Sequence, residues 1–261
     1  MTTVFPMKET RILCWNVNGI RAAEKKGFLK WLQQESPDIL CLQETKVPPG
    51  EISPELEQPP GYYTYWNSPE RKGYSGVATF VKEKPIRVSY GFGAKQFDVE
   101  GRVIITQYPE FTLFNVYFPN GKQSEERLKY KMDFYDVFLE FADSIKARGE
   151  KLIIGGDFNT AHKEIDLARP KENENVSGFL LMERAWMGKF VAHGYVDTFH
   201  HFNKEPNHYT WWSLRTRARE RNIGWRLDYV FVSEDLLDSV TEASILSDVI
   251  GSDHCPVGIK L

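Results

Sequence analysis

Leu152-Ile153-Ile154-Gly155-Gly156-Asp157-Phe158-Asn159 is an apolar run that passes through two glycines and ends in a carboxylate and a carboxamide. A continuous apolar run of this kind predicts a strand that is buried on both faces. The pattern recurs three times: residues 12–15 lead to Asn16-Val17-Asn18, residues 39–42 to Gln43-Glu44, and residues 113–117 to Pro119-Asn120. Ligands of open α/β sheets bind just beyond the carboxyl ends of the strands. The sequence therefore predicts an oxygen-rich edge suited to Mg²⁺ or Mn²⁺.

Other segments predict a mixed sheet rather than a purely parallel one. Residues 76–81, 103–108 and 111–116 are further predicted strands, and the short Pro109-Glu110 turn makes the last two an antiparallel hairpin. Residues 27–35 predict a helix between the first two strands, which gives a β-α-β unit. The fold class we expect is α/β, with two packed mixed sheets and helices outside them.

The longest predicted helix covers residues 124–148. Ser124 is suited to cap its first turn, and Glu125 and Glu126 complement the positive end of the helix dipole. One face carries apolar residues at helical spacing, which predicts packing on the core. These residues are Leu128, Tyr135, Phe138, Ala142 and Ile145.

Composition sets looser limits. The 261 residues are 41% hydrophobic and 14% aromatic, which is enough for a substantial core. The net charge of −3 excludes a global attraction to nucleic acid, so any such binding needs a local patch. The three cysteines form no Cys-x-x-Cys pair and are predicted to be reduced core thiols.

We expect one domain over residues 1–261, in which residues 1–6 are a disordered extension and residues 47–61 a surface loop. The N-terminus has no signal-peptide pattern, and no apolar run approaches about 20 residues. We therefore expect no membrane contact and an intracellular, cytoplasmic protein.

Asp228 is the most unusual polar residue, because it interrupts the apolar strand Trp225-Arg226-Leu227-Asp228-Tyr229. A buried carboxylate is costly unless it is paired. His254 in the Asp253-His254 pair is the candidate partner. Each polar cluster alone is also typical of an ordinary turn or a solvated loop, and their combination in order is what indicates a functional site.

At this point the chain resembles the exonuclease III family of abasic-site DNA endonucleases, within the endonuclease/exonuclease/phosphatase superfamily that includes DNase I. The matching blocks are Trp15-Asn16-Val17-Asn18-Gly19-Ile20-Arg21, Leu42-Gln43-Glu44-Thr45-Lys46, Val116-Tyr117-Phe118-Pro119-Asn120, Gly155-Gly156-Asp157-Phe158-Asn159, Gly224-Trp225-Arg226-Leu227-Asp228-Tyr229 and Gly251-Ser252-Asp253-His254-Cys255-Pro256. The resemblance implies a DNase I-like, four-layer α/β/β/α sandwich.

The resemblance also implies roles. Glu44 is expected to be the principal Mg²⁺ ligand, with Mn²⁺ as a substitute. The metal or its waters would also be contacted by Asn16, Asn18, Asp253, Asp157 and Asn159. Asp157, oriented by Asn159, is expected to activate the attacking water. His254, charged through Asp228, would bind a phosphate oxygen, as would Tyr117 and Asn120. An alternative assignment makes His254 the general base, and the sequence does not separate the two.

DNA contacts are expected around a segment that holds five arginines between Tyr209 and Tyr229, against Glu220 and Asp228. The resemblance places Trp211, Trp225 and Leu227 in a pocket for the extruded base-free sugar, and Arg215 at a position that inserts into the duplex. Residues 166–173, which end at Asn173, resemble a DNA-backbone contact loop. Lys122 lies in Gly121-Lys122-Gln123-Ser124, where the animal branch of the family has an inserting arginine.

The leading hypothesis is a Mg²⁺-dependent base-excision-repair nuclease. It would cut double-stranded DNA on the 5′ side of abasic sites, leave a 3′-hydroxyl, and also act as a 3′–5′ exonuclease and 3′-end-trimming enzyme. Incision 5′ of deoxyuridine belongs to the branch that this chain resembles. We expect a monomer associated with the nucleoid. The alternatives are a phosphatase acting on phosphoinositides or other small phosphate esters, and a DNA-binding module without catalysis.

Overall fold

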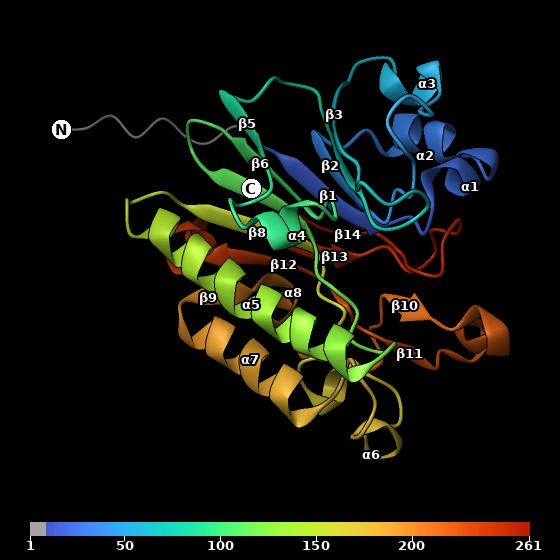
Figure 1. Cartoon of the computed structure of the whole chain (residues 1–261), viewed down its shortest axis with the longest axis vertical. Helices are drawn as coiled ribbons and strands as arrows, with labels where there is room; N and C mark the ends of the chain where they lie inside the picture. Colours follow the sequence, from blue (N-terminus) through green and yellow to red (C-terminus); the bar gives the residue numbers. More distant parts are fainter. Residues whose placement is uncertain (1–8) are drawn as a thin grey trace.

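The computed structural model describes residues 9–261, in which two six-stranded β-sheets pack face to face between layers of helices (Figure 1). The predicted extension, residues 1–6, lies outside the described residues. The first sheet has the strand order β13-β14-β1-β2-β4-β3, and β1 and β2 are parallel. Its strands are Arg11–Asn16 (β1), Ile39–Gln43 (β2), Tyr63–Asn67 (β3), Val77–Val81 (β4), Glu242–Ile245 (β13) and Val257–Lys260 (β14).

The second sheet has the order β5-β6-β7-β8-β12-β9, and β7 and β8 are parallel. Its strands are Arg87–Tyr90 (β5), Val103–Gln107 (β6), Thr112–Tyr117 (β7), Leu152–Asp157 (β8), Tyr195–Asp197 (β9) and Asp228–Ser233 (β12). The predicted hairpin is confirmed, because β6 and β7 pair antiparallel. A short ribbon of β10 (Trp211–Trp212) and β11 (Gly224–Trp225) lies apart from both sheets.

Helices cover the outer faces of both sheets, which completes the four layers. Apolar residues of α1 (Ile20–Lys25), α2 (Phe28–Glu35) and α3 (Pro54–Glu57) pack on the first sheet. Those of α5 (Glu125–Lys146) and α7 (Leu181–Ala192) pack on the second, where the two helices run side by side (Figure 1). The remaining short helices are α4 (Lys95–Asp98), α6 (Pro170–Asn173), α8 (Thr198–Phe202), and the 3₁₀ turns η1 (Glu164–Asp166), η2 (Leu214–Thr216), η3 (Ala218–Arg221) and η4 (Glu234–Ser239).

Three local predictions need correction. The connection from β1 to β2 contains two helices rather than one, because Gly27 adopts φ 97 and separates α1 from α2. A six-residue helix such as α1 is too short to show a clear apolar period. Asp228 is the first residue of β12 and does not interrupt it. The predicted surface loop, residues 47–61, contains the short helix α3.

The predicted face of α5 is largely confirmed. Tyr135, Phe138, Ala142 and Ile145 are buried, whereas Leu128 is only partly buried. Ser124 caps the helix by accepting a hydrogen bond from the backbone N–H of Arg127 over 3.2 Å. The same helix also buries Lys131, which the apolar pattern does not predict.

Close approach of the two sheets depends on a glycine in β8. A Cβ at Gly155 would lie 2.4 Å from Sγ of Cys14 in the opposite sheet, so a larger residue would push the sheets apart. Cys14, Cys41 and Cys255 are free and buried, as predicted. The short distance between the sheets allows side chains of β1 to reach the end of β8.

Candidate active site

Three neighbouring strands of the second sheet place three polar side chains in one row. In the register of β8, Asp157 lies opposite Tyr117 of β7 on one side and opposite Asp228 of β12 on the other. All three side chains are buried. Strand register alone therefore brings together residues that the sequence predicts from three separate motifs.

Amide groups from both sheets hold the Asp157 carboxylate. Nδ2 of Asn16 donates to its Oδ2 over 2.8 Å, and the backbone N–H of Asn159 donates to its Oδ1 over 2.7 Å. Nδ2 of Asn159 adds a bond of 3.2 Å to Oδ2, and Oδ1 of Asn159 accepts from Asn120 over 2.9 Å. Both carboxylate oxygens of Asp157 therefore accept hydrogen bonds, which fix the orientation of the carboxylate.

The predicted pair of His254 and Asp228 is present. Nδ1 of His254 lies 2.8 Å from Oδ2 of Asp228, and the hydroxyl of Thr210 donates to the same oxygen over 2.6 Å. Burial lowers the pKa of His254, but the adjacent Asp228 carboxylate outweighs this effect and raises that pKa to about 10. The imidazole is therefore a cation at neutral pH.

The carboxyl groups of the site differ in proton affinity. Burial and the charge of Asp228 raise the pKa of Asp157 to about 7, although the His254 cation opposes the shift. Burial also acts to raise the pKa of Asp253, but the charge of His254 and hydrogen bonds from Asn18 and Trp211 lower it. Carboxyl groups whose pKa values are pushed apart in this way are typical of sites that perform acid–base chemistry.

A second oxygen-rich cluster lies where the loops after β1 and β2 meet. The hydroxyl of Tyr117 donates to Oε1 of Glu44, and Nδ2 of Asn18 donates to Oδ1 of Asp253 over 2.9 Å. Nζ of Lys46 lies 2.8 Å from Oε2 of Glu44 and donates to Oδ1 of Asn18 over 2.5 Å. Two side-chain oxygens therefore already converge on one cationic centre, the ammonium of Lys46.

This donor set fits a hard divalent cation, which prefers carboxylate and amide oxygens. Asp157, Asp228 and His254 form another group, whose possible ligand atoms all lie within 4.8 Å of one another. A histidine must be neutral to bind a metal, whereas His254 is held in its charged form by Asp228. The cluster around Glu44 is therefore the better metal site of the two.

Backbone strain is concentrated at the same place. Asn18, Glu44, Lys46 and Asn159 all have left-handed backbones, with φ values of 45, 51, 52 and 52°. Such conformations disfavour residues other than glycine and cost on the order of 1–3 kcal/mol where the residue is not suited to them. These residues lie in the loops at the ends of β1, β2 and β8. Contacts with the surrounding structure must therefore hold the loops in this conformation.

These groups open into one cavity of about 320 Å³. One wall is apolar and consists of Trp211, Trp225 and Leu227, which pack with Phe179. The indole N–H of Trp211 donates to Oδ2 of Asp253 over 3.0 Å, so this wall is joined to the oxygen-rich cluster. Lys122 also lines the cavity, and its Nζ lies 6.0 Å from the centre of the Trp211 ring.

Three predicted site residues stand behind the cavity lining. Asn16 contacts Asp157, Tyr117 contacts Glu44, and Asp228 contacts His254. The sequence did not indicate the role of Thr210, which supports Asp228 from a position 18 residues away. The sequence also gave no role to Lys46, although Lys46 is the last residue of one of the quoted motifs.

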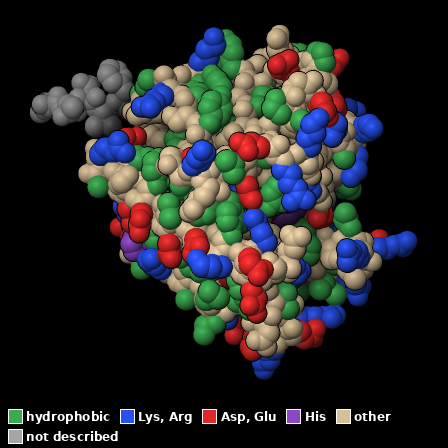
Figure 2. Space-filling view, viewed as in Figure 1, with side chains coloured by type: hydrophobic (Ala, Val, Ile, Leu, Met, Phe, Trp, Pro, Cys, Tyr) green, Lys and Arg blue, Asp and Glu red, His purple; other side chains and the backbone are tan. Residues whose placement is uncertain are grey.

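Three of the five arginines in the predicted patch are exposed, and their contact with DNA stays a prediction. Arg215, Arg217 and Arg221 are exposed, and Figure 2 shows Lys and Arg side chains projecting from the loop beyond β10 and β11. Arg226 was wrongly included: it is buried, and its guanidinium binds Asp166 over 2.7 Å and Asp197 over 2.6 Å.

Asn173, which is predicted to contact DNA, lies outside the cavity. Asn173 ends α6, does not line the cavity, and donates from Nδ2 to the carbonyl of Arg169 over 2.9 Å. Its contact with DNA stays a prediction.

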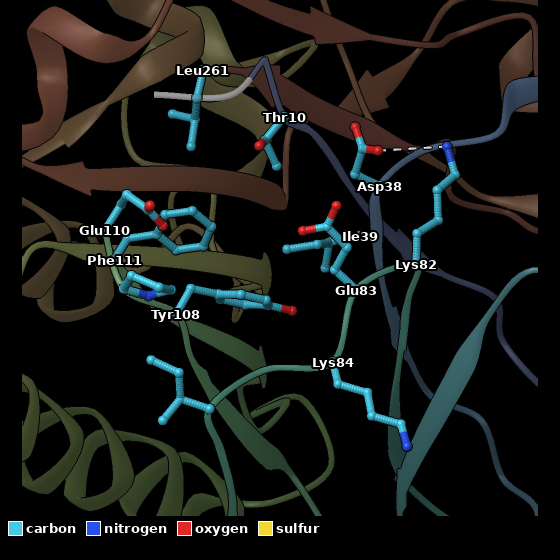
Figure 3. A pocket seen from close by; sticks show the side chains of 12 residues that line it. Thr10, Asp38, Ile39, Lys82, Glu83, Lys84, Tyr108, Glu110, Phe111 and Leu261 are labelled. Atoms are coloured by element: carbon cyan, nitrogen blue, oxygen red, sulfur yellow. Dashed lines mark ion pairs between the residues drawn. The ribbon is translucent and has the colours of Figure 1, made fainter. Parts of the chain in front are cut away.

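Another cavity, of about 340 Å³, lies at the opposite end of the strands, where Asp38 precedes β2 and where Tyr108 and Phe111 flank the β6–β7 turn (Figure 3). The five residues of β2 separate this cavity from Glu44 by roughly 17 Å at 3.3 Å per strand residue. The side chains around this cavity therefore cannot reach Asp157 or His254.

Within residues 9–261, no helix has both the length and the apolar character needed to cross a membrane.

Known proteins resemble this chain over nearly its whole length. Residues 13–254 match the Endonuclease/Exonuclease/phosphatase family. The chain is 44% identical over 249 residues to an exodeoxyribonuclease of Bacillus subtilis, which covers 95% of this chain and 97% of that protein. It is 40% identical over 255 residues to a DNA-(apurinic or apyrimidinic site) endonuclease of Dictyostelium discoideum, covering 96% and 70%. A solved AP endonuclease from Leishmania major has a TM-score of 0.89 at 30% identity, covering 99% of this chain and 89% of that one.

Proposed function

Since the chain belongs to the endonuclease/exonuclease/phosphatase family, we propose that this nuclease hydrolyses double-stranded DNA on the 5′ side of abasic sites and leaves a 3′-hydroxyl. One observation carries the proposal. A single cavity combines Asp157 and the charged His254 with an apolar wall of tryptophan and leucine side chains. The first group suits phosphodiester hydrolysis, and the wall suits a sugar that carries no base.

Asp157 is the general base of this proposal. Its pKa of about 7 lies near neutral pH, where a base is most effective, and both of its oxygens are held in place. His254, with a pKa of about 10, carries its proton already and is suited to donate a hydrogen bond. The two pKa shifts therefore favour Asp157 over His254, which were the two candidate bases.

The charged imidazole of His254 stabilises negative charge that develops on a phosphate oxygen, and Asp228 keeps it charged. Asn120 lines the same cavity and binds Asn159, so it is placed to orient the phosphate and the attacking water. Tyr117 is proposed to contact phosphate as well. In the structure its hydroxyl binds Glu44, which gives it a role in orienting that carboxylate.

A bound Mg²⁺ ion would neutralise charge on the phosphate and on the departing 3′ oxygen, and Mn²⁺ would substitute for it. Glu44 would be its principal ligand. Asn18 and Asp253 would bind it directly or through water, because both lie in the cluster around Lys46. Asp157 and Asn159 line the adjacent side of the cavity, and Asn16 lies behind Asp157. These three residues would contact the waters of the ion.

The wall of Trp211, Trp225 and Leu227 would hold the extruded abasic sugar. An abasic site costs less to extrude than an intact nucleotide, because it has no base to unstack. Arg215, Lys122 and Asn173 would contact the DNA, and the exposed arginines would supply the local positive charge that the acidic chain needs.

The proposal extends to the predicted 3′–5′ exonuclease and 3′-end-trimming activities, and to incision 5′ of deoxyuridine. We also propose that the chain acts as a single-domain monomer inside the cell, on its nucleoid. The continuous packing between the two sheets supports one domain.

A duplex with one abasic analogue and a labelled 5′ end tests the proposal. In Mg²⁺ we expect one product that ends in a 3′-hydroxyl immediately 5′ of the analogue, and in EDTA no product. Turnover of inositol phosphates in place of the duplex would support the phosphatase alternative. Tight duplex binding without magnesium-dependent cutting would instead indicate a DNA-binding module.

A further inference from the structure

Lys131 of α5 and Glu183 of α7 form an ion pair of 2.6 Å behind the active site, and both side chains have no exposed surface. A buried ion pair is seldom more stabilising than apolar residues of the same volume. Stability alone therefore does not account for this pair. The other hydrogen bonds of the two side chains show what the pair holds.

Lys131 reaches the loop that follows β8. Its Nζ donates to the backbone carbonyl of Asn159 over 2.7 Å and to Oγ1 of Thr160 over 2.8 Å. Asn159 has a left-handed backbone and binds the Asp157 carboxylate through both its N–H and its side chain. Lys131 thus anchors the strained residue that orients the proposed base.

Glu183 reaches the opposite loop. Its Oε2 accepts from the backbone N–H of Gly178 over 2.6 Å and of Leu180 over 3.0 Å, and its Oε1 accepts from Oγ of Ser177 over 3.0 Å. Ser177 and Gly178 line the active-site cavity. A Cβ at Gly178 would lie 3.3 Å from the Asn159 carbonyl and 3.3 Å from the Trp225 ring, so its backbone packs directly on that indole.

We propose that the Lys131–Glu183 ion pair is a positioning element that fixes the catalytic loop and the pocket wall relative to each other, and so sets the preference for abasic over intact DNA. The inference rests on the proposed function of the same cavity. Lys131 fixes one loop through Asn159, and Glu183 fixes the other through Gly178. The pair thus joins the two loops in addition to the backbone hydrogen bond of 2.8 Å from Ala161 to the Gly178 carbonyl. When the pair is lost, the loops are held less firmly relative to each other, so the pocket admits normal nucleotides more readily and the base is less well oriented.

The test is the double variant Lys131→Met/Glu183→Gln, which removes both charges and so leaves no lone buried ion. The preference is measured as kcat/KM for incision at an abasic analogue divided by kcat/KM for 3′–5′ digestion of an intact duplex. We expect this ratio to fall at least tenfold, with a loss in kcat for the abasic duplex. The matched control is Asp136→Asn/Lys189→Met, which removes an exposed ion pair of 3.0 Å between the same two helices. Its ratio should equal that of the parent.

Gly178→Ala provides a second variant, because it disturbs the junction while both charges of the ion pair remain in place. Gly178 has φ 101, and the added Cβ would press on Asn159 and Trp225. We expect the same ratio to fall. An unchanged ratio in the folded double variant would overturn the proposal. If the double variant does not fold, an unchanged ratio in Gly178→Ala would overturn it.

Amide hydrogen exchange separates this inference from the proposed function, because it needs no substrate. In the double variant, or in Gly178→Ala if the double variant does not fold, residues 157–161 and 177–180 should exchange faster together, and the helix control should leave both unchanged. Faster exchange in only one of the two loops, or in neither, would overturn the coupling whatever DNA the enzyme cuts. If the variants show this exchange pattern but the parent does not incise abasic DNA, only the proposed function is contradicted.

Discussion

Burial and the charge of Asp228 raise the pKa of Asp157, and Asp228 outweighs burial to raise the pKa of His254, with opposite consequences for the charge of the two groups. For Asp157 the shift favours the neutral acid, and for His254 it favours the cation. One buried carboxylate therefore helps to prepare both the proposed base, which titrates near neutral pH, and a fixed positive charge. This division of roles depends on distances of a few ångströms, so single substitutions at these residues are informative.

Asp157→Asn should nearly abolish incision and leave binding of an abasic duplex unchanged. The amide keeps the shape of the side chain but cannot take a proton, and loss of a general base costs roughly 10²–10⁴-fold in rate. Single-turnover incision and equilibrium binding measure the two effects. Asp133→Asn, on the exposed side of α5, is the control. A variant that keeps most of its incision rate would make His254 the better candidate base.

Glu44→Gln should shift the magnesium dependence of incision to higher concentration, with little change in DNA affinity. The substitution removes the only formal negative charge contributed by the loop after β2 to the converging oxygens. The measurement is a titration of activity against Mg²⁺. Glu110→Gln, at the distant cavity, should titrate like the parent. An unchanged midpoint for Glu44→Gln would place the metal elsewhere.

Trp225→Ala should reduce discrimination between abasic and intact DNA more than overall affinity. The indole packs against Gly178 and lies edge-on to Phe179 and Trp211, so its loss widens the pocket. Phosphate contacts, which supply most non-specific affinity, would remain. The readout is cutting of intact relative to abasic duplex. Trp66→Ala, which changes a partly buried tryptophan packed against the core of the first sheet, is the control. An equal loss on all substrates with a lower Tm would mark Trp225 as purely structural.

The sequence predicts Asp157, Asp228 and His254 because each one stands out at the end of an apolar run or in a short motif. It does not predict Lys131 and Glu183. A lysine in an amphipathic helix normally belongs to the solvated face, and its partner lies 52 residues away. Arg226 was misjudged for the same reason, because Asp166 is 60 residues distant and only the fold brings them together.

At the level of elements, the boundaries that depend on local chemistry were predicted best. The start of α5 is fixed by the side chain of Ser124, which the sequence shows directly. The separation of α1 from α2 depends on the backbone of Gly27 and on packing against the first sheet. Neither of these is visible as a periodic pattern.

Ser124→Ala should lower the free energy of unfolding by about 1 kcal/mol, because the backbone N–H of Arg127 loses its acceptor. Denaturant unfolding measures the change, and incision should be unaffected. Ser144→Ala, within the same helix, removes only a bond from its own hydroxyl to the Phe141 carbonyl and serves as the control. Equal stability of the two variants would show that the cap contributes nothing.

At the level of the whole molecule, a buried charge network joins the second sheet to the loops beside the pocket. Arg226 binds Asp166 and Asp197, and His200 lies 2.7 Å from Asp166. Burial opposes ionisation of Asp166, but Arg226 and His200 outweigh it and hold its pKa well below the ordinary value of 3.8. The network is therefore a source of stability that depends on pH.

Asp166→Asn should make the protein less stable at neutral pH and less sensitive to acid. Because the folded-state pKa of Asp166 is depressed, its contribution is complete above the unfolded value near 3.8 and is lost as the pH falls below it. The difference in unfolding free energy between parent and variant should therefore shrink on acidification. Asp248→Asn, on an exposed loop, is the control. A constant gap for Asp166→Asn would exclude the network from acid unfolding.

The buried centre of Asn16, Asp157, Asp228 and His254 draws on almost the whole sequence, although its members are adjacent in space through two hydrogen bonds and the pairing of β8 with β12. A chain leaving the ribosome presents Asn16 long before His254 exists to meet it. Until β12 has paired with β8, Asp228 does not face Asp157, and the imidazole has no partner to hold its charge. Partly synthesised chains would therefore lack the completed centre, and any activity that depends on it would appear only after β12 and the segment around His254 have folded.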